Sequence, residues 1–384
     1  MKRGLWRILC GSMLVVLVAQ STGCVSDAIA VAFTNPPNGG RETVDPDRPT
    51  LEIYDAAGQL NVPGPPEATL AYWVMEPAPA KVSLIPQSPE ATATPPRHSG
   101  WRSADAKYHK DQGFVRTQRG PASTNQPAVA TVIVLHGWAS KVRSSDTLWH
   151  LSATLADAGC RVILPDLRGH GDSTGEYVTS GYREVEDLSA LLDHVQQTYG
   201  QADAPNTPVG VIGHSYGGGI AIQFAAHDPR VERVVGLAPL ADIRPAMLPG
   251  VRMFARRFRP ISWFFYLNWA IDQKAITEAQ QKMEERTGAD LAKNNALYRV
   301  QKVHVPVLIL QGGQDDATPL AGAERLRDAN PEAVELVVYP EAGHTSFLRD
   351  DFDDVEARLR TWVDGLTETS TADRSAQTKS VSRR

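Results

Sequence analysis

The sequence predicts an α/β fold with a mostly parallel sheet flanked by helices. From Val129 onward, short apolar, β-branched runs alternate with segments of helical periodicity. In residues 182–200, the apolar side chains recur at the spacing of one helix face. Continuous apolar strands separated by helices are typical of a parallel sheet that helices cover on both sides. The expected strands are residues 130–135, 161–166, 208–213, 231–238, 306–311 and 334–340, preceded by one within 68–77.

The composition is that of a globular protein with a substantial core. The chain has 384 residues, of which 42% are hydrophobic and 22% charged, and its formal net charge is −5. Beyond Arg256, Arg257 and Arg259 there is no basic run long enough to follow a nucleic-acid backbone. We therefore expect no nucleic-acid partner.

The N-terminus has the organisation of an export signal. Lys2, Arg3 and Arg7 precede the apolar run "ILCGSMLVVLVA", and no acidic residue occurs before Asp27. The run is too short for a comfortable transmembrane helix, so residues 1–23 are expected to be a signal peptide. The segment "STGC", which ends at Cys24, resembles the lipobox of bacterial lipoproteins, although Ser21 stands where Leu is usual.

That resemblance implies that Cys24 is lipidated and tethers the exported protein to a bacterial membrane. Val25 follows Cys24, and by analogy with lipoprotein sorting this favours the outer membrane, or otherwise the periplasmic face. Two alternatives stay open: cleavage after Ala30 in "AIA", and an uncleaved N-terminal anchor. If Cys24 is lipidated, Cys160 is left alone and no disulfide framework is available.

A glycine-rich segment, "VIGHSYGGG" from Val211, follows one of the predicted strands. It lacks the Lys of a phosphate-binding loop and the glycine spacing of a dinucleotide fingerprint, so we expect neither a nucleotide cofactor nor a metal. Gly213 to Gly217 instead match G-x-S-x-G, a strand-to-helix turn that exposes a serine above a sheet. This pattern makes Ser215 the candidate nucleophile.

A serine nucleophile needs a base, and the base needs an orienting acid. On this architecture the acid and then the histidine come later in the chain, each on a loop after a strand. "GGQDDATP" follows the strand at 306–311 and contains Asp315 and Asp316, and "EAGHTSF" follows the strand at 334–340 and contains His344. Both carboxylates are candidates for the acid.

These segments together resemble the α/β-hydrolase-fold serine hydrolases, and within them the monoglyceride-lipase and serine-aminopeptidase-like group. The similar segments, which extend from Val129 to about Leu366, are "VLHGW", "DLRGHGDSTG", "GHSYGG", "GGQDDATP" and "AGHTSF", in the family's order. The resemblance implies that Ser215 is the nucleophile, His344 the base and Asp315 the acid, with Asp315 favoured over Asp316 by its place between Gly312 and Pro319.

The resemblance further implies an oxyanion hole formed by the backbone N–H groups of Tyr216 and Trp138. His214, His170 and His136 are interpreted as structural, because the later His344 already supplies the base. A Ser nucleophile excludes the dehalogenase and epoxide-hydrolase branches. Cleavage of carboxylic esters through an acyl-enzyme is the favoured activity, and a peptidase or a catalytically silent surface lipoprotein is the alternative.

The expected organisation is a signal peptide at 1–23, a Pro/Gly-rich tether at 24–65, a hydrolase domain at 66–368 and a disordered tail at 369–384. About seventy residues separate two of the predicted strands, far more than a crossover needs, and residues 240–303 are expected to form a cap over the site. Its aromatic residues are a candidate acyl-binding wall next to a membrane, or simply cap core: Trp263, Phe264, Phe265, Tyr266 and Trp269.

Overall fold

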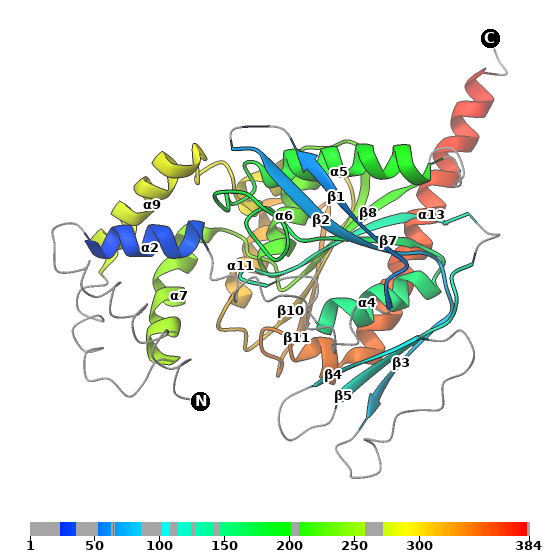
Figure 1. Cartoon of the computed structure of the whole chain (residues 1–384), viewed down its shortest axis with the longest axis horizontal. Coiled ribbons are helices and arrows are strands. Elements are labelled where there is room, and N and C mark those ends of the chain that lie inside the picture. Colours follow the sequence, from blue (N-terminus) through cyan, green and yellow to red (C-terminus); the bar gives the residue numbers. More distant parts are fainter. Residues whose placement is uncertain are drawn as a thin grey trace.

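The fold centres on an eight-stranded, mostly parallel sheet. The computed structural model describes residues 24–35, 53–62, 64, 66–85, 102–107, 114–123, 127–140, 146–200, 207–257 and 272–381. The strand order is β1-β2-β7-β6-β8-β9-β10-β11 (Figure 1). β1 and β2 pair antiparallel, β2 pairs antiparallel with β7, and the other neighbours are parallel. The strands are β1 (Ala56–Val62), β2 (Ala68–Met75), β6 (Thr131–Leu135), β7 (Arg161–Pro165), β8 (Val209–His214), β9 (Val231–Leu237), β10 (Val307–Gly312) and β11 (Val334–Tyr339).

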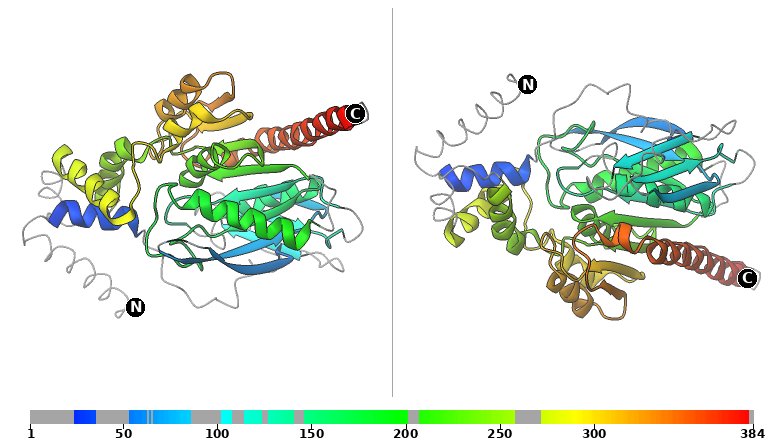
Figure 2. Two further views of the ribbon diagram at one scale, coloured as in Figure 1. Left: turned by 90° about the horizontal axis from the view of Figure 1, so that it is seen from above. Right: turned by 90° about the horizontal axis from the view of Figure 1, so that it is seen from below.

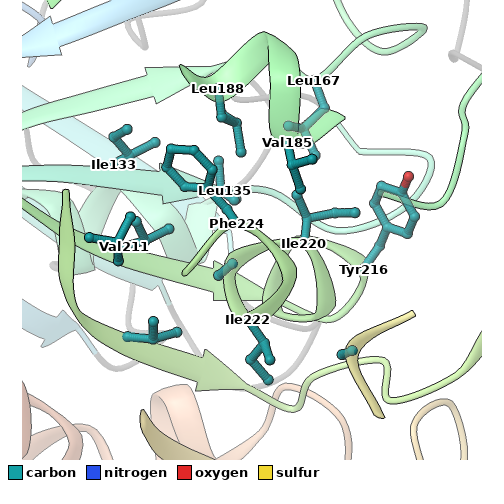
Figure 3. Close-up of a cluster of buried hydrophobic side chains, with 14 of the residues drawn as sticks. Ile133, Leu135, Leu167, Val185, Leu188, Val211, Tyr216, Ile220, Ile222 and Phe224 are labelled. Atoms are coloured by element: carbon teal, nitrogen blue, oxygen red, sulfur yellow. The ribbon is translucent and has the colours of Figure 1, made fainter. Parts of the chain in front are cut away.

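Helices cover both faces of this sheet, and alternate side chains of each strand enter different cores. On β6, Val132 and Val134 pack with α4 (Asp146–Asp157) and α13 (Phe352–Val381). Ile133 and Leu135 pack on the other face with α5 (Glu184–Tyr199), α6 (Tyr216–Ala225) and α11 (Leu320–Ala329), as Figure 3 shows for the part around α6. The continuous apolar runs of the sequence therefore reflect burial on both faces, and the predicted α/β fold with a mostly parallel sheet flanked by helices is confirmed.

A helical layer lies to one side of the sheet. Between β9 and β10 the chain forms α7 (Ile243–Arg257), α9 (Gln273–Thr287), α10 (Ala296–Arg299) and the 3₁₀ turn Val300–Lys302. α2 (Cys24–Thr34) joins α7 and α9 in a small apolar cluster of its own. Figure 2 shows these three helices together at the end of the molecule opposite the end of α13.

The segment expected to be a tether contains ordered structure. α2 buries Ile29 and Ala30 in the helical layer, and β1 pairs along its whole length with β2. Residues 24–34 contain neither proline nor glycine, so the composition of the whole segment conceals an apolar helix. Likewise, α13 extends over residues 369–381, within the segment that we expected to be a disordered tail, and no proline or glycine occurs after Gly365.

Several sequence predictions lie outside the described residues. They include the signal peptide at 1–23 and the aromatic run with Trp263 and Phe264. Within the ranges given above, no helix combines the length and the apolarity needed to cross a bilayer.

A smaller antiparallel sheet adjoins the large one, with the strand order β3 (Ala80–Ile85), β5 (Phe114–Arg119) and β4 (Arg102–Lys107). Arg119 connects the two sheets. Its fully buried side chain pairs with Asp55 at 2.6 Å and donates to the carbonyl oxygens of Ile53 and Glu76. A buried guanidinium with this set of acceptors fixes the geometry of the junction, because removing a partner would leave the charge uncompensated.

Candidate active site

Ser215 occupies the turn between β8 and α6. Its φ is 55° and its ψ −116°, a conformation that costs on the order of 1–3 kcal/mol for a residue with a side chain. Its backbone is fixed on both sides, since its N–H donates to Leu237 O at 2.8 Å and its carbonyl accepts from Leu240 N at 2.9 Å. The strained residue is therefore held by β9 and the chain that follows it.

The glycines around Ser215 are required by close backbone contacts. A Cβ on Gly213 would lie 2.1 Å from Gly217 O, and a Cβ on Gly217 would lie 2.4 Å from His136 O. Gly219 is confined in the same way, because its Cβ would lie 2.4 Å from Leu240 O. No side chain can be accommodated at these distances, so the glycines permit the turn that places Ser215 at the start of α6.

The loop after β6 lies against this turn. His136 is fully buried, its Nε2 accepts from Leu167 N–H at 2.9 Å, and its Nδ1 then carries the proton and donates to Gly137 O at 2.8 Å. A Cβ on Gly137 would lie 3.4 Å from Ser215 Cβ. Gly137 therefore lies beside Ser215, and Trp138 is the next residue of this loop. Tyr216 is the first residue of α6, and its N–H is one of the first four of a helix, which have no intrahelical acceptor.

Asp315 and His344 meet on the loops after β10 and β11. Asp315 Oδ2 accepts from His344 Nδ1 at 2.8 Å. The Asp315 side chain is fully buried, whereas 22% of the His344 side chain is exposed. Asp316 is exposed to solvent, so the structure brings only Asp315 of the two candidates to the histidine.

Two residues that the sequence did not indicate hold the Asp315 carboxylate. Gln311 Nε2 donates to Oδ2 at 2.9 Å, and Thr318 contributes its backbone N–H to Oδ1 at 2.8 Å and its hydroxyl within 2.9 Å of Oδ2. Burial alone would raise the pKa of Asp315, but the hydrogen bond and charge of His344 hold that pKa below its ordinary value. The carboxylate is therefore kept ionised and oriented toward the imidazole. Gln311 is buried and is the penultimate residue of β10, four residues before Asp315, so an amide at the end of the strand that precedes the acid loop is the signal that could have indicated it.

His214 links the Ser215 turn to His344. Its ring centroid is 4.9 Å from that of His344, and it directly precedes Ser215. Burial lowers the pKa of His214 to about 3, so its ring is neutral at physiological pH. Among the described residues no hydrogen bond joins Ser215 Oγ to His344, and such catalytic hydrogen bonds often form only with substrate bound.

Tyr216 is anchored by a buried carboxylate. Its hydroxyl donates to Glu184 Oε1 at 3.0 Å, and the same carboxylate accepts from the N–H groups of Thr179 at 2.7 Å and Gly181 at 2.8 Å. This network fixes the first turn of α6, and Figure 3 shows the Tyr216 ring at the end of the α6 cluster.

Two other kinds of candidate site are a surface groove and a cluster of metal-binding side chains. A groove of about 550 Å³ lies at the opposite end of β10 and β11, between their first residues and α13, and is remote from Ser215. No three His, Cys, Asp or Glu side chains within the described ranges converge so that they could hold a metal ion.

Buried neutral histidines make the stability of the protein dependent on pH. Burial lowers the pKa of His136 to about 4 and those of His150, His170 and His214 to about 3, whereas an unfolded histidine has a pKa of about 6.5. The unfolded chain binds more protons between these pH values. The stability that the neutral histidines contribute is therefore present above about pH 6.5 and is lost as the pH falls towards 4.

We expect His170→Asn to make the pH dependence of the unfolding free energy shallower by about 1.4 kcal/mol per pH unit near pH 5. Urea titrations of both proteins at pH 7, 6 and 5 measure this, and parallel curves would contradict it.

The comparisons with known proteins identify the family of the chain. The family model described as "Serine aminopeptidase, S33" matches residues 126–351, more than half of the chain. A monoacylglycerol lipase of Mycolicibacterium smegmatis is 24% identical over 252 residues, which are 60% of this chain and 87% of the relative. A monoglyceride lipase of Rattus norvegicus is 27% identical over 254 residues, 61% of this chain and 82% of the relative.

Among solved structures, an esterase of Pyrococcus furiosus superposes with a TM-score of 0.55, covering 86% of this chain and 97% of that one at 17% identity. That likeness shows the fold, and the family model supplies the assignment. The chain belongs to the serine aminopeptidase S33 family of α/β-hydrolases.

Proposed function

We propose that the protein is a serine hydrolase that cleaves carboxylic esters, with Ser215 as nucleophile, His344 as general base and Asp315 as the orienting acid. The observation that carries the proposal is the 2.8 Å hydrogen bond between His344 and the buried carboxylate of Asp315, on the loops after β10 and β11. The strained turn that presents Ser215 lies at the same end of the sheet, since all three residues follow the carboxyl ends of parallel strands.

In the proposed reaction, Ser215 Oγ attacks the ester carbonyl carbon while His344 Nε2 takes the hydroxyl proton. The carbonyl π electrons move to oxygen, and the backbone N–H groups of Tyr216 and Trp138 donate to that oxyanion. When the tetrahedral intermediate collapses, His344 returns its proton to the departing alcohol and leaves an acyl-Ser215. Water then attacks the acyl group by the same route, which releases the acid and restores Ser215.

The Asp315 carboxylate acts through His344. By accepting the Nδ1 proton it fixes the tautomer with Nε2 free to act as the base, and it stabilises the imidazolium that forms in each step. His136, His170 and His214 serve as neutral structural groups in this proposal, which agrees with their lowered pKa values.

Ester substrates are favoured by the names of the relatives, which are lipases and an esterase, although the family description names an aminopeptidase. A peptidase that grips a free amino terminus needs carboxylates facing the site. Three acidic residues of α9 are instead engaged along the helix and its end: Glu278 faces Lys274, Glu285 accepts from Gln281, and Glu284 accepts from Leu291 N–H at 2.8 Å. Since these residues act as a solvated helix face, the ester reading is the stronger one.

The N-terminal helix supports the proposed lipid anchor. α2 begins at Cys24 and buries Ser26, Ile29 and Ala30 in the helical layer. Cleavage after Ala30 would divide this helix and remove Ser26, Ile29 and Ala30 from the helical layer, whereas processing before Cys24 retains every described residue of it. We therefore propose that the mature protein starts at a lipidated Cys24 and is exported and anchored in a bacterial membrane. In a Gram-negative host this is the outer membrane, or otherwise the periplasmic face.

The first expected outcome concerns the reaction itself. The soluble chain lacking residues 1–24 should hydrolyse p-nitrophenyl butyrate far faster than alanine p-nitroanilide, and Ser215→Ala should abolish turnover and labelling by a fluorophosphonate probe. Circular dichroism serves as the folding control. Undiminished labelling of a folded Ser215→Ala protein would refute the assignment of Ser215 as the nucleophile. Faster cleavage of the anilide than of the ester would favour the peptidase alternative.

The two adjacent carboxylates give a matched pair of variants. Asp315→Asn should lower kcat by roughly a thousandfold or more, because the His344 tautomer is no longer fixed. Asp316→Asn, at an exposed position one residue away, should stay within about threefold of the wild type, since surface substitutions usually have little effect. Steady-state kinetics on one ester decides between them, and the reverse ranking would assign the role to Asp316.

The anchor is tested in a bacterial host that processes lipoproteins. Metabolic labelling with a palmitate analogue should mark the wild-type chain, and Cys24→Ser should lose the label and leave the membrane fraction. Cys160→Ser, which removes the buried free thiol, is the control that should keep the label. Label that persists in Cys24→Ser would exclude this site.

A further inference from the structure

The N-terminal helix α2 is tied to two parts of the hydrolase. On the helical layer, Lys282 of α9 pairs with Asp27 at 2.7 Å and donates to Ser26 Oγ at 2.9 Å. At its other end, Thr34 O accepts from Val178 N–H at 2.8 Å, and Asn35 Nδ2 donates to Glu176 O at 2.8 Å. α2 is thus held from its first to its last turn, between α9 and the loop that follows β7.

Phe33, in the last turn of α2, lies against the loop that approaches Ser215. Its ring centroid is 5.7 Å from that of Trp138, with 32° between the ring planes. The far edge of the Phe33 ring faces α7, since a Cβ on Gly250 would lie 3.7 Å from Phe33 Cζ. Phe33 is half-buried and fills the space between the helical layer and Trp138.

The loop that carries Trp138 has a strained backbone. Ala139, the next residue, has a φ of 54°, and Ser140 N–H closes a turn onto Gly137 O at 3.3 Å. His136 holds the start of the loop from within the core. Trp138 is half-buried: it packs against the core cluster around α6 and also contacts Phe33. A loop that stores strain keeps one conformation only where neighbours restrain it, and Phe33 is such a neighbour on the side of Trp138.

We propose that Phe33 is a positioning residue that acts through Trp138 and keeps the Trp138 N–H aligned with the oxyanion of the transition state. Phe33, in the last turn of the N-terminal helix, then supports the catalytic apparatus, although it lies before the family's matched region at 126–351. The inference rests on the proposed serine-hydrolase function, because it gives a role to one oxyanion donor of that mechanism.

The test compares two apolar residues of the same helix. Phe33→Ala should lower kcat for p-nitrophenyl acetate about tenfold with KM changed less than about threefold, because the donor is displaced and not removed. Ile29→Ala, in the helical-layer cluster, should lower the melting temperature while kcat stays within about twofold. The affinity for a boronic acid that mimics the tetrahedral intermediate should fall with kcat in Phe33→Ala only.

A double-mutant cycle shows whether Phe33 acts through Trp138. The variant that combines Phe33→Ala with Trp138→Ala should be no slower than Trp138→Ala alone, since the contact is already gone. Losses that multiply, an unchanged kcat in Phe33→Ala, or equal losses in Phe33→Ala and Ile29→Ala would overturn the proposal. Each of these results leaves the serine-hydrolase assignment intact as long as Ser215→Ala is inactive, and activity that persists in Ser215→Ala would refute that assignment instead.

Discussion

The backbone contact at the β8–α6 turn is the constraint on which the site depends. A Cβ on Gly213 would collide with Gly217 O, and a Cβ on Gly217 would collide with His136 O of the β6 loop, so neither position can carry a side chain. These contacts accompany the strained conformation of Ser215, whose φ is 55°, and place the β6 loop beside the turn. Because β8 pairs with β6 on one side and β9 on the other, the same turn is also fixed by hydrogen bonds from the chain after β9.

The charge states of the groups around this turn follow from their burial and hydrogen bonds. The buried carboxylate of Asp315 is stabilised by hydrogen bonds from Gln311, Thr318 and His344, so its charge is directed at one imidazole. The neighbouring histidines are buried and neutral at physiological pH, as their lowered pKa values show. His344, in contrast, is partly exposed, with 22% of its side chain accessible to solvent.

The sequence predicted the parallel part of the sheet because those strands are buried on both faces and form continuous apolar runs. β1 was not predicted, since "AAGQLNV" is an exposed edge strand with polar residues and no clear alternation. α2 was hidden by the prolines that follow it. Asp315 and His344 could be placed on the correct loops from the order of motifs, and the structure adds their contact.

The contacts that support the site could not be predicted, because they join residues far apart in the sequence. Gln311 and Thr318 acquire a role only when the β10 loop folds around Asp315. The contact between Phe33 and Trp138 requires the N-terminal helix α2 to pack with α7 and α9, so that its last turn reaches the β6 loop. Periodicity and motif spacing describe single elements, whereas these contacts depend on how the elements pack.

The central claim is that Ser215 is the residue that attacks the substrate. Tandem mass spectrometry of the wild-type chain after reaction with a fluorophosphonate locates the covalent adduct on a single side chain. The account predicts one adduct, on Ser215 within the segment "VIGHSYGGG". An adduct on any other residue, with Ser215 unmodified in an active preparation, would contradict it.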